Sequence, residues 1–226
     1  MNADDYLFVA DETGPAEIKD LPVVSGKIIG ERGFQSGEVD VFRVDKGYYP
    51  GQIKIREEAA MLANENNVSA TWAELGVETG RSAYFLSQYL PANGRFFLFD
   101  SFQGLPENWA LSQQSISPKG KFACEVPVFK DERLVVVPGW FEDTLPHAEM
   151  SGPLGLIHID SDLYSSCKTA LERLDEQIVP GTVILFDEFW GYPNWREGEY
   201  KALTEWHREF RYVVRDTKFR VVIECV

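Results

Sequence analysis

The chain has 226 residues, 44% of them hydrophobic, which is enough for one α/β domain of ordinary size with a small appendage. Its formal net charge of −14 argues against a nucleic-acid backbone or an anionic membrane as partner. Three widely spaced cysteines without a CxxC pair are typical of reduced thiols. The acidic N-terminus lacks a basic targeting signal and no apolar run reaches membrane-spanning length, so the sequence predicts a cytoplasmic protein.

The first fifty residues differ from the rest of the chain. Turn signals surround short β-like runs such as residues 39–44. We expect residues 1–50 to be an N-terminal extension that either covers the site or forms a subunit contact, with a hinge at 47–51. Residues 51–226 are then the main domain, which begins with a helix predicted over 53–66.

From residue 70 onward, strand-like and helix-like segments alternate. Strands are predicted at 71–75, 95–99, 133–137, 154–159 and 182–186, and helices at 81–89, 163–178 and 197–210. Two closing strands at 212–214 and 219–223 have a short link, so they should pair as an antiparallel hairpin at the sheet edge. The pattern predicts an α/β fold with a mostly parallel seven-stranded sheet, an antiparallel edge strand and helices on both faces.

Two of these apolar runs each end in a pair of acids. Asp160 and Asp162 follow the strand at 154–159, and Asp187 and Glu188 follow the strand at 182–186. The carboxyl edge of a parallel sheet is where ligands bind, and four acids there repel one another unless some are protonated or a cation lies among them. Carboxylate oxygens suit Mg²⁺. The acids could instead cap the following helices, an alternative that is serious for Asp162 and weaker for all four together.

The first strand leads into a turn with glycines at 76 and 80, ahead of a helix N-terminus that offers N–H groups to an anion. The second strand ends at Asp100, a usual partner of ribose hydroxyls. The single G-x-x-x-G is not a dinucleotide fingerprint, which points to another adenosine-bearing ligand. The chain also lacks a Tyr-x-x-x-Lys pair, so a dehydrogenase or an epimerase is disfavoured.

The segment from Glu74 to Ala83 resembles the S-adenosylmethionine motif of class I methyltransferases, close to its form in catechol O-methyltransferases. Segments 100–106, 139–146, 158–164 and 180–188 resemble the macrocin O-methyltransferase family, which methylates sugar hydroxyls of antibiotics. The resemblance covers roughly residues 70 to 210 and implies a Rossmann-like class I methyltransferase fold.

The resemblance also implies roles for single residues. Asp100 would bind the ribose, Ser82 the methionine carboxylate, and Trp140 would lie near the adenine. The whole implied cofactor set is Glu74, Gly76, Glu78, Thr79, Gly80, Ser82, Asp100, Ser101, Trp140 and Asp160. Asp160, Asp187 and Glu188 would hold Mg²⁺. The last pair is commonly Asp-Asp in this family and Asp-Asn in the catechol enzymes, so Glu188 is a departure and would bind the ion less directly or through water.

The predicted reaction is methyl transfer from S-adenosylmethionine to a hydroxyl of a small-molecule acceptor, a glycosyl or polyhydroxylated natural product. Mg²⁺ held on Asp160 would position the acceptor oxygens and stabilise the charge that develops on them. Asp162 is the candidate general base, since it lies just beyond Asp160. The catechol enzymes use a Lys three positions past the equivalent of Asp160, where this chain has Leu163. The alternative is a non-catalytic adenosine-ligand-binding regulatory or assembly subunit. The resemblance further implies a homo-oligomer.

Two further features are open to more than one interpretation. His158 shares a strand face with Asp160 and could hydrogen-bond the metal site, but a satisfied core histidine is the favoured interpretation. The aromatics that follow the acidic strand ends could wall an acceptor pocket or simply pack in the core, and the sequence does not decide between these roles for Tyr164, Trp190, Tyr192 and Trp195.

Overall fold

The computed structural model describes residues 21–22, 50–216 and 219–226. The expected extension over residues 1–50, including its β-like run at 39–44, therefore falls almost wholly outside the described residues, as does most of the expected hinge. None of the helices in the described part of the chain has both the length and the apolar character needed to cross a bilayer.

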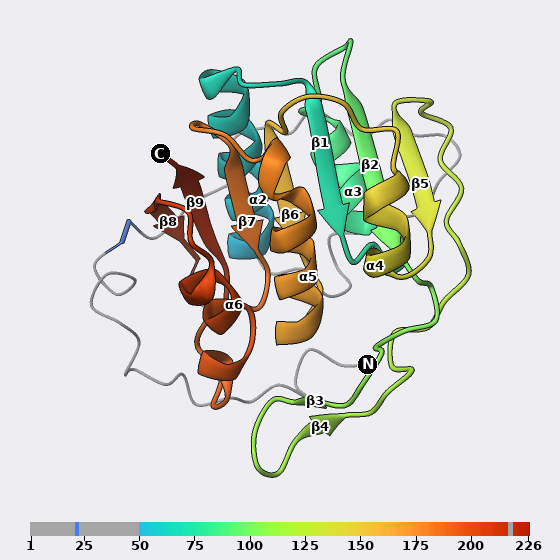
Figure 1. Cartoon of the computed structure of the whole chain (residues 1–226), viewed down its shortest axis with the longest axis vertical. Coiled ribbons are helices and arrows are strands. Elements are labelled where there is room, and N and C mark those ends of the chain that lie inside the picture. Colours follow the sequence, from blue (N-terminus) through green and yellow to red (C-terminus); the bar gives the residue numbers. More distant parts are fainter. Residues whose placement is uncertain (1–20, 23–49, 217–218) are drawn as a thin grey trace.

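A seven-stranded sheet forms the centre of the domain, with strand order β5-β2-β1-β6-β7-β9-β8 (Figure 1). Neighbours among the first five strands pair in parallel, whereas β9 runs antiparallel to both β7 and β8. The strands are β1 Thr71–Leu75, β2 Arg95–Asp100, β5 Leu134–Pro138, β6 Leu156–Ile159, β7 Val183–Phe186, β8 Phe210–Arg215 and β9 Val221–Cys225. The mostly parallel sheet and the antiparallel pair at its edge confirm the predicted fold.

Helices cover both faces of this sheet (Figure 1). Helices α2 Pro50–Asn66 and α3 Arg81–Ser87 pack on one face, and α4 Phe141–Thr144, α5 Tyr164–Leu174 and α6 Glu199–Glu205 pack on the other. Successive strand residues point to opposite faces, so in β1 Trp72 joins the core beneath α2 and α3 while Ala73 and Leu75 join the core beneath α5. Burial on both faces explains why these strands are continuous apolar runs.

The boundaries of two predicted helices are wrong by several residues. The helix predicted over 163–178 ends at Leu174, and the one predicted over 197–210 ends at Glu205. Asp175 accounts for both, because its carboxylate accepts hydrogen bonds from Trp206 Nε1 at 3.0 Å and from Arg208 Nε at 2.9 Å. These contacts draw the chain after α6 back toward the end of α5, and 3₁₀ turns occupy Leu145–His147, Asp175–Gln177 and Trp195–Glu197.

A small two-stranded sheet lies beyond the main one and was not predicted. It consists of β3 Trp109–Ala110 and β4 Ile116–Ser117, paired antiparallel. In Figure 1 this hairpin lies below the ends of the main-sheet strands, on the side where β1, β2 and β5 terminate. It therefore forms part of the boundary of the space at the carboxyl edge.

Candidate functional site

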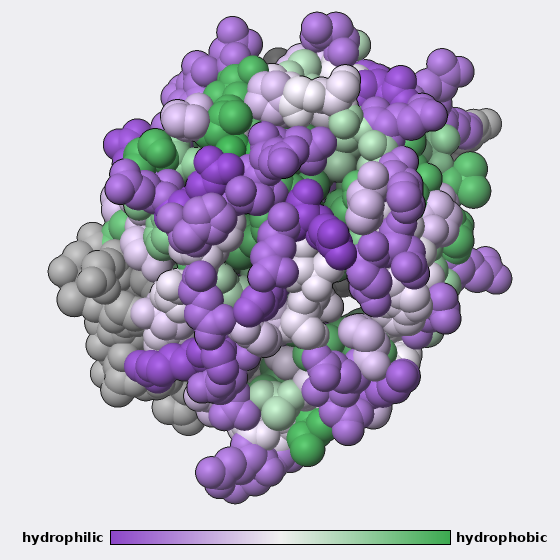
Figure 2. Space-filling view, viewed as in Figure 1, coloured by the Kyte–Doolittle hydropathy of each residue, from purple (hydrophilic) through white to green (hydrophobic). Residues whose placement is uncertain are grey.

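A cavity of about 820 Å³ lies at the carboxyl edge of the parallel strands. The space-filling view shows the face around it to be mainly hydrophilic and hollowed between the body of the domain and the β3–β4 hairpin (Figure 2). All four acids singled out in the sequence line it, together with most of the implied cofactor residues: Gly76, Glu78, Thr79, Ser82, Asp100, Ser101, Trp140, Asp160, Asp162, Asp187 and Glu188. The structure thus brings these residues around one space.

The turn after β1 is pressed against the loop after β6. Gly76 has a φ of 93°, and a Cβ at this position would lie 1.8 Å from the carbonyl oxygen of Asp160. The backbone N–H of Asp160 in turn donates to the carbonyl of Leu75 at 2.9 Å. Only glycine combines this backbone conformation with so close an approach, so Gly76 allows the two halves of the cavity edge to meet.

Asp100 at the end of β2 orders the same turn. Its Oδ2 accepts the backbone N–H groups of Val77 and Glu78, both at 2.8 Å, and its Oδ1 accepts the N–H of Phe102 at 2.7 Å. The bonds from Val77 and Glu78 fix the glycine-containing turn, and the bond from Phe102 fixes the loop after β2. Asp100 itself lines the cavity. A ribose would meet a carboxylate that is already fixed in orientation.

Two members of the implied cofactor set do not line the cavity. Glu74 is fully buried, and its Oε1 accepts hydrogen bonds from the Ser82 hydroxyl and, at 3.2 Å, from His158 Nδ1. Gly80 has a φ of 79° and its missing Cβ would meet the ring of Phe129. Both residues therefore support the site from behind, by fixing the start of α3 and the turn that precedes it.

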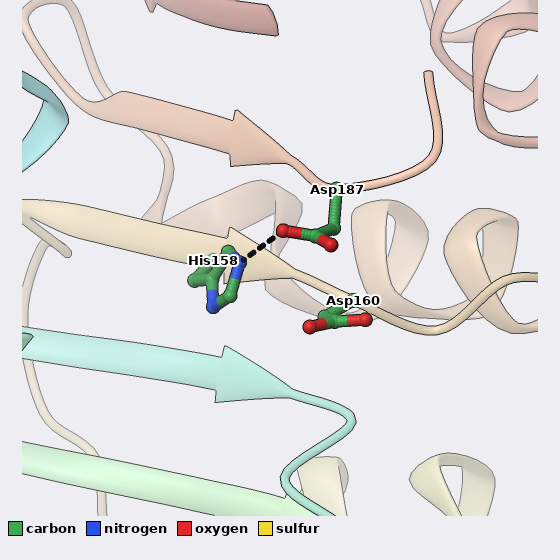
Figure 3. Close-up of side chains that lie close together, drawn as sticks. All are labelled: His158, Asp160 and Asp187. Carbon is green, nitrogen blue, oxygen red and sulfur yellow. Dashed lines mark hydrogen bonds and ion pairs between the residues drawn. The ribbon is translucent and has the colours of Figure 1, made fainter. Parts of the chain in front are cut away.

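His158 connects this buried acid to the second acidic strand end (Figure 3). The close-up shows its ring on β6 directed toward Asp187, and Nε2 lies 3.4 Å from Asp187 Oδ1. Burial lowers the pKa of His158, but the hydrogen bonds to Asp187 and Glu74 outweigh it and raise the pKa to about 9. His158 is thus a core residue with both ring nitrogens partnered, and it also touches the acidic cluster.

Two buried arginines hold Asp187. Arg56 on α2 donates from Nη2 to Oδ1 at 2.7 Å, and Arg220 donates from Nε to Oδ1 at 2.6 Å and from Nη2 to Oδ2. Asp216 fixes Arg220 in place, since its Oδ1 accepts the Arg220 backbone N–H at 2.9 Å. Burial favours the neutral carboxyl, but Arg220 and Arg56 hold the pKa of Asp187 well below its usual range.

The remaining acids of the cluster have the opposite electrostatic environment. Removal from water and the charge of Asp187 raise the pKa of Asp160 to about 7. Burial and the charges of Asp160 and Asp187 raise the pKa of Asp162 well above its ordinary value, and burial with Asp187 does the same for Glu188. These groups are therefore poised to take up a proton or to pair with a cation.

The arrangement does not fit the Mg²⁺ site that the resemblance implies. Donor atoms of His158, Asp160 and Asp187 lie within 4.8 Å of one another, but Glu188 is not part of that group among the described residues. Asp187 already accepts three strong hydrogen bonds from arginines, and the third member is a histidine with a raised pKa. Mg²⁺ prefers oxygen ligands and would sit beside guanidinium groups here, which repel it.

The aromatics that follow the acidic strand ends divide between the two roles left open by the sequence. Tyr192 lines the cavity and Tyr164, Trp190 and Trp195 do not. Trp195 is fully buried and packs edge-on against Tyr200. Of these four aromatics, Tyr192 thus forms part of the cavity wall, whereas Trp195 belongs to the packed core.

Arg56 and Arg220 were not identified from the sequence, although each left a signal. Arg56 lies among Ile55, Ala59 and Ala60 on the buried face of α2, and Arg220 comes directly before the apolar strand β9. A charged residue inside an apolar pattern is seldom buried without a partner, so either one could have indicated an ion pair with the acidic strand ends.

Comparisons with known proteins agree with this fold. The sequence model of the macrocin-O-methyltransferase family matches residues 51–213. A tetracenomycin-C rhamnosyl 4'-O-methyltransferase from Streptomyces olivaceus is 32% identical over 143 residues, covering 55% of this chain and 54% of the relative. The demethyldecarbamoylnovobiocin O-methyltransferase from Streptomyces niveus is 27% identical over 175 residues, covering 67% of this chain and 65% of the relative.

The chain thus spans between about half and two thirds of the length of these two relatives. Among solved structures, the calicheamicin methyltransferase CalS11 superposes with a TM-score of 0.62 at 22% identity, covering 78% of this chain and 80% of that one. At this level of identity the likeness shows the fold.

Proposed function

Because the chain belongs to the macrocin-O-methyltransferase family, we propose that it transfers a methyl group from S-adenosylmethionine to a hydroxyl of a small-molecule acceptor. One observation carries the proposal. The cavity at the carboxyl edge joins the Gly76 turn and Asp100, which suit an adenosine-bearing cofactor, to a group of acids with raised pKa beyond it. A volume of about 820 Å³ leaves room for an acceptor beside the cofactor.

The cofactor would lie over the ends of β1 and β2. Asp100 would accept hydrogen bonds from the ribose hydroxyls, and Trp140 would lie near the adenine. The unpaired N–H groups at the start of α3, beside Ser82, would receive the methionine carboxylate. The methyl group on the sulfonium would then point toward Asp160 and Asp162.

Methyl transfer is an in-line displacement. The acceptor oxygen forms a bond to the methyl carbon as the carbon–sulfur bond breaks, and the electron pair of that bond stays on sulfur as the neutral thioether. The hydroxyl proton goes to a base within hydrogen-bonding reach, for which we propose Asp162. Burial and the neighbouring acids raise its pKa, so its ionised form takes up a proton more readily than an ordinary carboxylate does. The protein's further contribution is to hold the two reactants in line.

Mg²⁺ enters none of these steps. The resemblance implies Mg²⁺ on Asp160, Asp187 and Glu188, but the arginines that hold Asp187 do not suit that role. Positioning of the acceptor therefore falls to side chains of the chain itself.

The names of the relatives support a glycosylated natural product as the class of acceptor. One acts on a rhamnosyl group of a tetracenomycin and the other on a novobiocin precursor. We propose the same broad class of acceptor for this chain.

We also propose that the protein is a homo-oligomer. Light scattering of the purified full chain tests this directly.

Titration calorimetry with S-adenosylhomocysteine, followed by transfer of a labelled methyl group to a panel of glycosides, tests the activity. We expect binding of S-adenosylhomocysteine and incorporation of label into at least one glycoside. Absence of binding would overturn the proposal. Binding without transfer to any acceptor would instead favour the non-catalytic adenosine-binding subunit.

A further inference from the structure

Three aromatic rings form a continuous wall on one side of the cavity. The centroids of Trp109 and Tyr192 lie 6.0 Å apart and those of Tyr192 and Phe219 lie 6.3 Å apart, both pairs packed edge to face. All three residues line the cavity, although they come from β3, the segment after β7 and the segment before β9. Tyr192 and Phe219 follow β7 and precede β9, which β6 separates from the β1 and β2 ends that suit the cofactor, so we assign this wall to the acceptor's part of the cavity.

Two buried polar groups beside this aromatic wall lack hydrogen bonds that they could make in the described part of the chain. Oε2 of Glu188 is buried and receives no hydrogen bond there, and the hydroxyl of Tyr192, a residue only 2% exposed, finds no acceptor for its proton. Both residues line the cavity. Because buried polar atoms are normally hydrogen-bonded, these two call for a ligand that donates to Glu188 and accepts from Tyr192.

The charges around the cavity limit what that ligand can be. Of the described residues that line it, eight are acids and two are arginines. Arg220 is committed to Asp187. Arg81 begins α3 in the cofactor's part, where burial raises the pKa of Glu78 and the charge of Arg81 opposes that rise. Arg56 and His158, which do not line the cavity, also pair with Asp187. Among the described residues Asp162 and Glu188 therefore remain without a basic partner, and they attract a cation and oppose phosphate groups.

We propose that the acceptor carries a protonated amine close to the hydroxyl that is methylated, as an amino sugar does, and that a sugar nucleotide is rejected. The ammonium group donates to Glu188 and lies over the face of a ring in the aromatic wall, while a neighbouring sugar oxygen accepts the Tyr192 proton. Aromatic rings combined with carboxylates are the usual recognition elements for ammonium groups. This inference rests on the proposed function and specifies its substrate class.

Calorimetry on the full chain saturated with S-adenosylhomocysteine tests the inference. The probes are 4-nitrophenyl β-D-glucoside, its three analogues with an amine in place of the hydroxyl at C2, C3 or C4, and thymidine diphosphate glucose. S-adenosylhomocysteine lacks the sulfonium charge, so it does not mask the acidic cavity. We expect at least one amine to bind about tenfold or more tightly than the parent glucoside. Thymidine diphosphate glucose should bind more weakly than that amine.

Two variants with the same change of charge locate the effect. In Glu188→Gln the preference for the amine should fall below about threefold, whereas in Glu149→Gln, an exposed acid outside the cavity, it should stay unchanged. The inference is overturned if no amine binds more tightly than the parent, if the sugar nucleotide binds best, or if the preference survives in Glu188→Gln. A separate titration with S-adenosylhomocysteine distinguishes failure of the proposed function. If the proposed function is wrong, the chain will not bind S-adenosylhomocysteine at all.

Discussion

The arginine pair on Asp187 leads to the sharpest prediction, which uses the variant Arg220→Gln. The substitution removes both hydrogen bonds from Arg220 to Asp187 and leaves a buried carboxylate with Arg56 as its remaining arginine. Arg220 is 4% and Asp187 3% exposed, so water does not replace the lost partner. Breaking a buried pair in this way costs about 3–5 kcal/mol. In a domain of this size, we expect Tm to fall by about 6–20 °C.

Thermal unfolding with and without Mg²⁺ makes the same variant a test of the metal. In the wild type, about 10 mM MgCl₂ should raise Tm no more than a KCl solution of equal ionic strength, because the arginines occupy Asp187. In Arg220→Gln, Arg56 stays on Oδ1 of Asp187, but Oδ2 loses its hydrogen bond from Arg220 and can bind a cation together with Asp160. A Mg²⁺ concentration about 100 times the dissociation constant should then restore about 2.7 kcal/mol.

Arg211→Gln is the matched control, since Arg211 is 66% exposed and its ion pair with Glu224 lies at the surface. It should change stability by less than about 1 kcal/mol. The reasoning is refuted if Mg²⁺ stabilises the wild type as much as the variant, or if Arg220→Gln is no less stable than Arg211→Gln.

Three further predictions concern the turn, the buried histidine and the proposed base. Gly76→Ala should destabilise the fold by more than about 3 kcal/mol. The control Gly120→Ala should destabilise it by about 1 kcal/mol, because Gly120 has a similar φ of 79° but nothing within 4 Å of its Cβ. Equal losses of Tm in the two variants would contradict the clash of a Gly76 Cβ with the β6 loop. His158 has a folded pKa of about 9 against about 6.5 unfolded, so its stabilisation is complete below about pH 6.5 and is lost as the pH rises to 9. The fall in Tm over this range should be smaller in His158→Gln, and an identical fall would exclude the histidine as its cause. Asp162→Asn should lower turnover by about 10²–10⁴-fold, because an amide takes up no proton. The affinity for S-adenosylhomocysteine should stay unchanged, because Asn tolerates the left-handed φ of 63° at this position. A loss of turnover of under tenfold would assign the base to another residue.

The strands of the sheet and the position of the cavity followed from local patterns. Runs such as residues 154–159 and 182–186 are buried on both faces, so their apolar character marks them as parallel strands and the acids after them mark the carboxyl edge. The Gly76 turn was predictable for the same reason, because only glycine permits the contact that its neighbours make. The residues that indicate a strand and the residues that mark its carboxyl end thus lie within a few positions of each other in the sequence.

The electrostatics of the site depend on contacts that no local pattern contains. Arg56 reaches Asp187 across 131 residues of sequence, and Arg220 reaches it across 33. The hairpin that brings Trp109 to the cavity has strands of two residues, too short to show a period. The ends of α5 and α6 differ from the predicted ends for a similar reason. The contacts of Asp175 with Trp206 and Arg208 override the helical propensity of the segment.

The arginines also separate two acids that the sequence presents as equivalent. Asp160 and Asp187 each follow a buried parallel strand, yet the pKa of Asp160 is raised to about 7 and that of Asp187 is held well below its usual range. A carboxylate that binds protons so weakly is a poor base, so the acceptor's proton should move toward the side of the cavity formed by Asp160 and Asp162. Asp187 would then act by keeping a fixed negative charge beside Asp160, which sustains the raised pKa on which proton uptake depends.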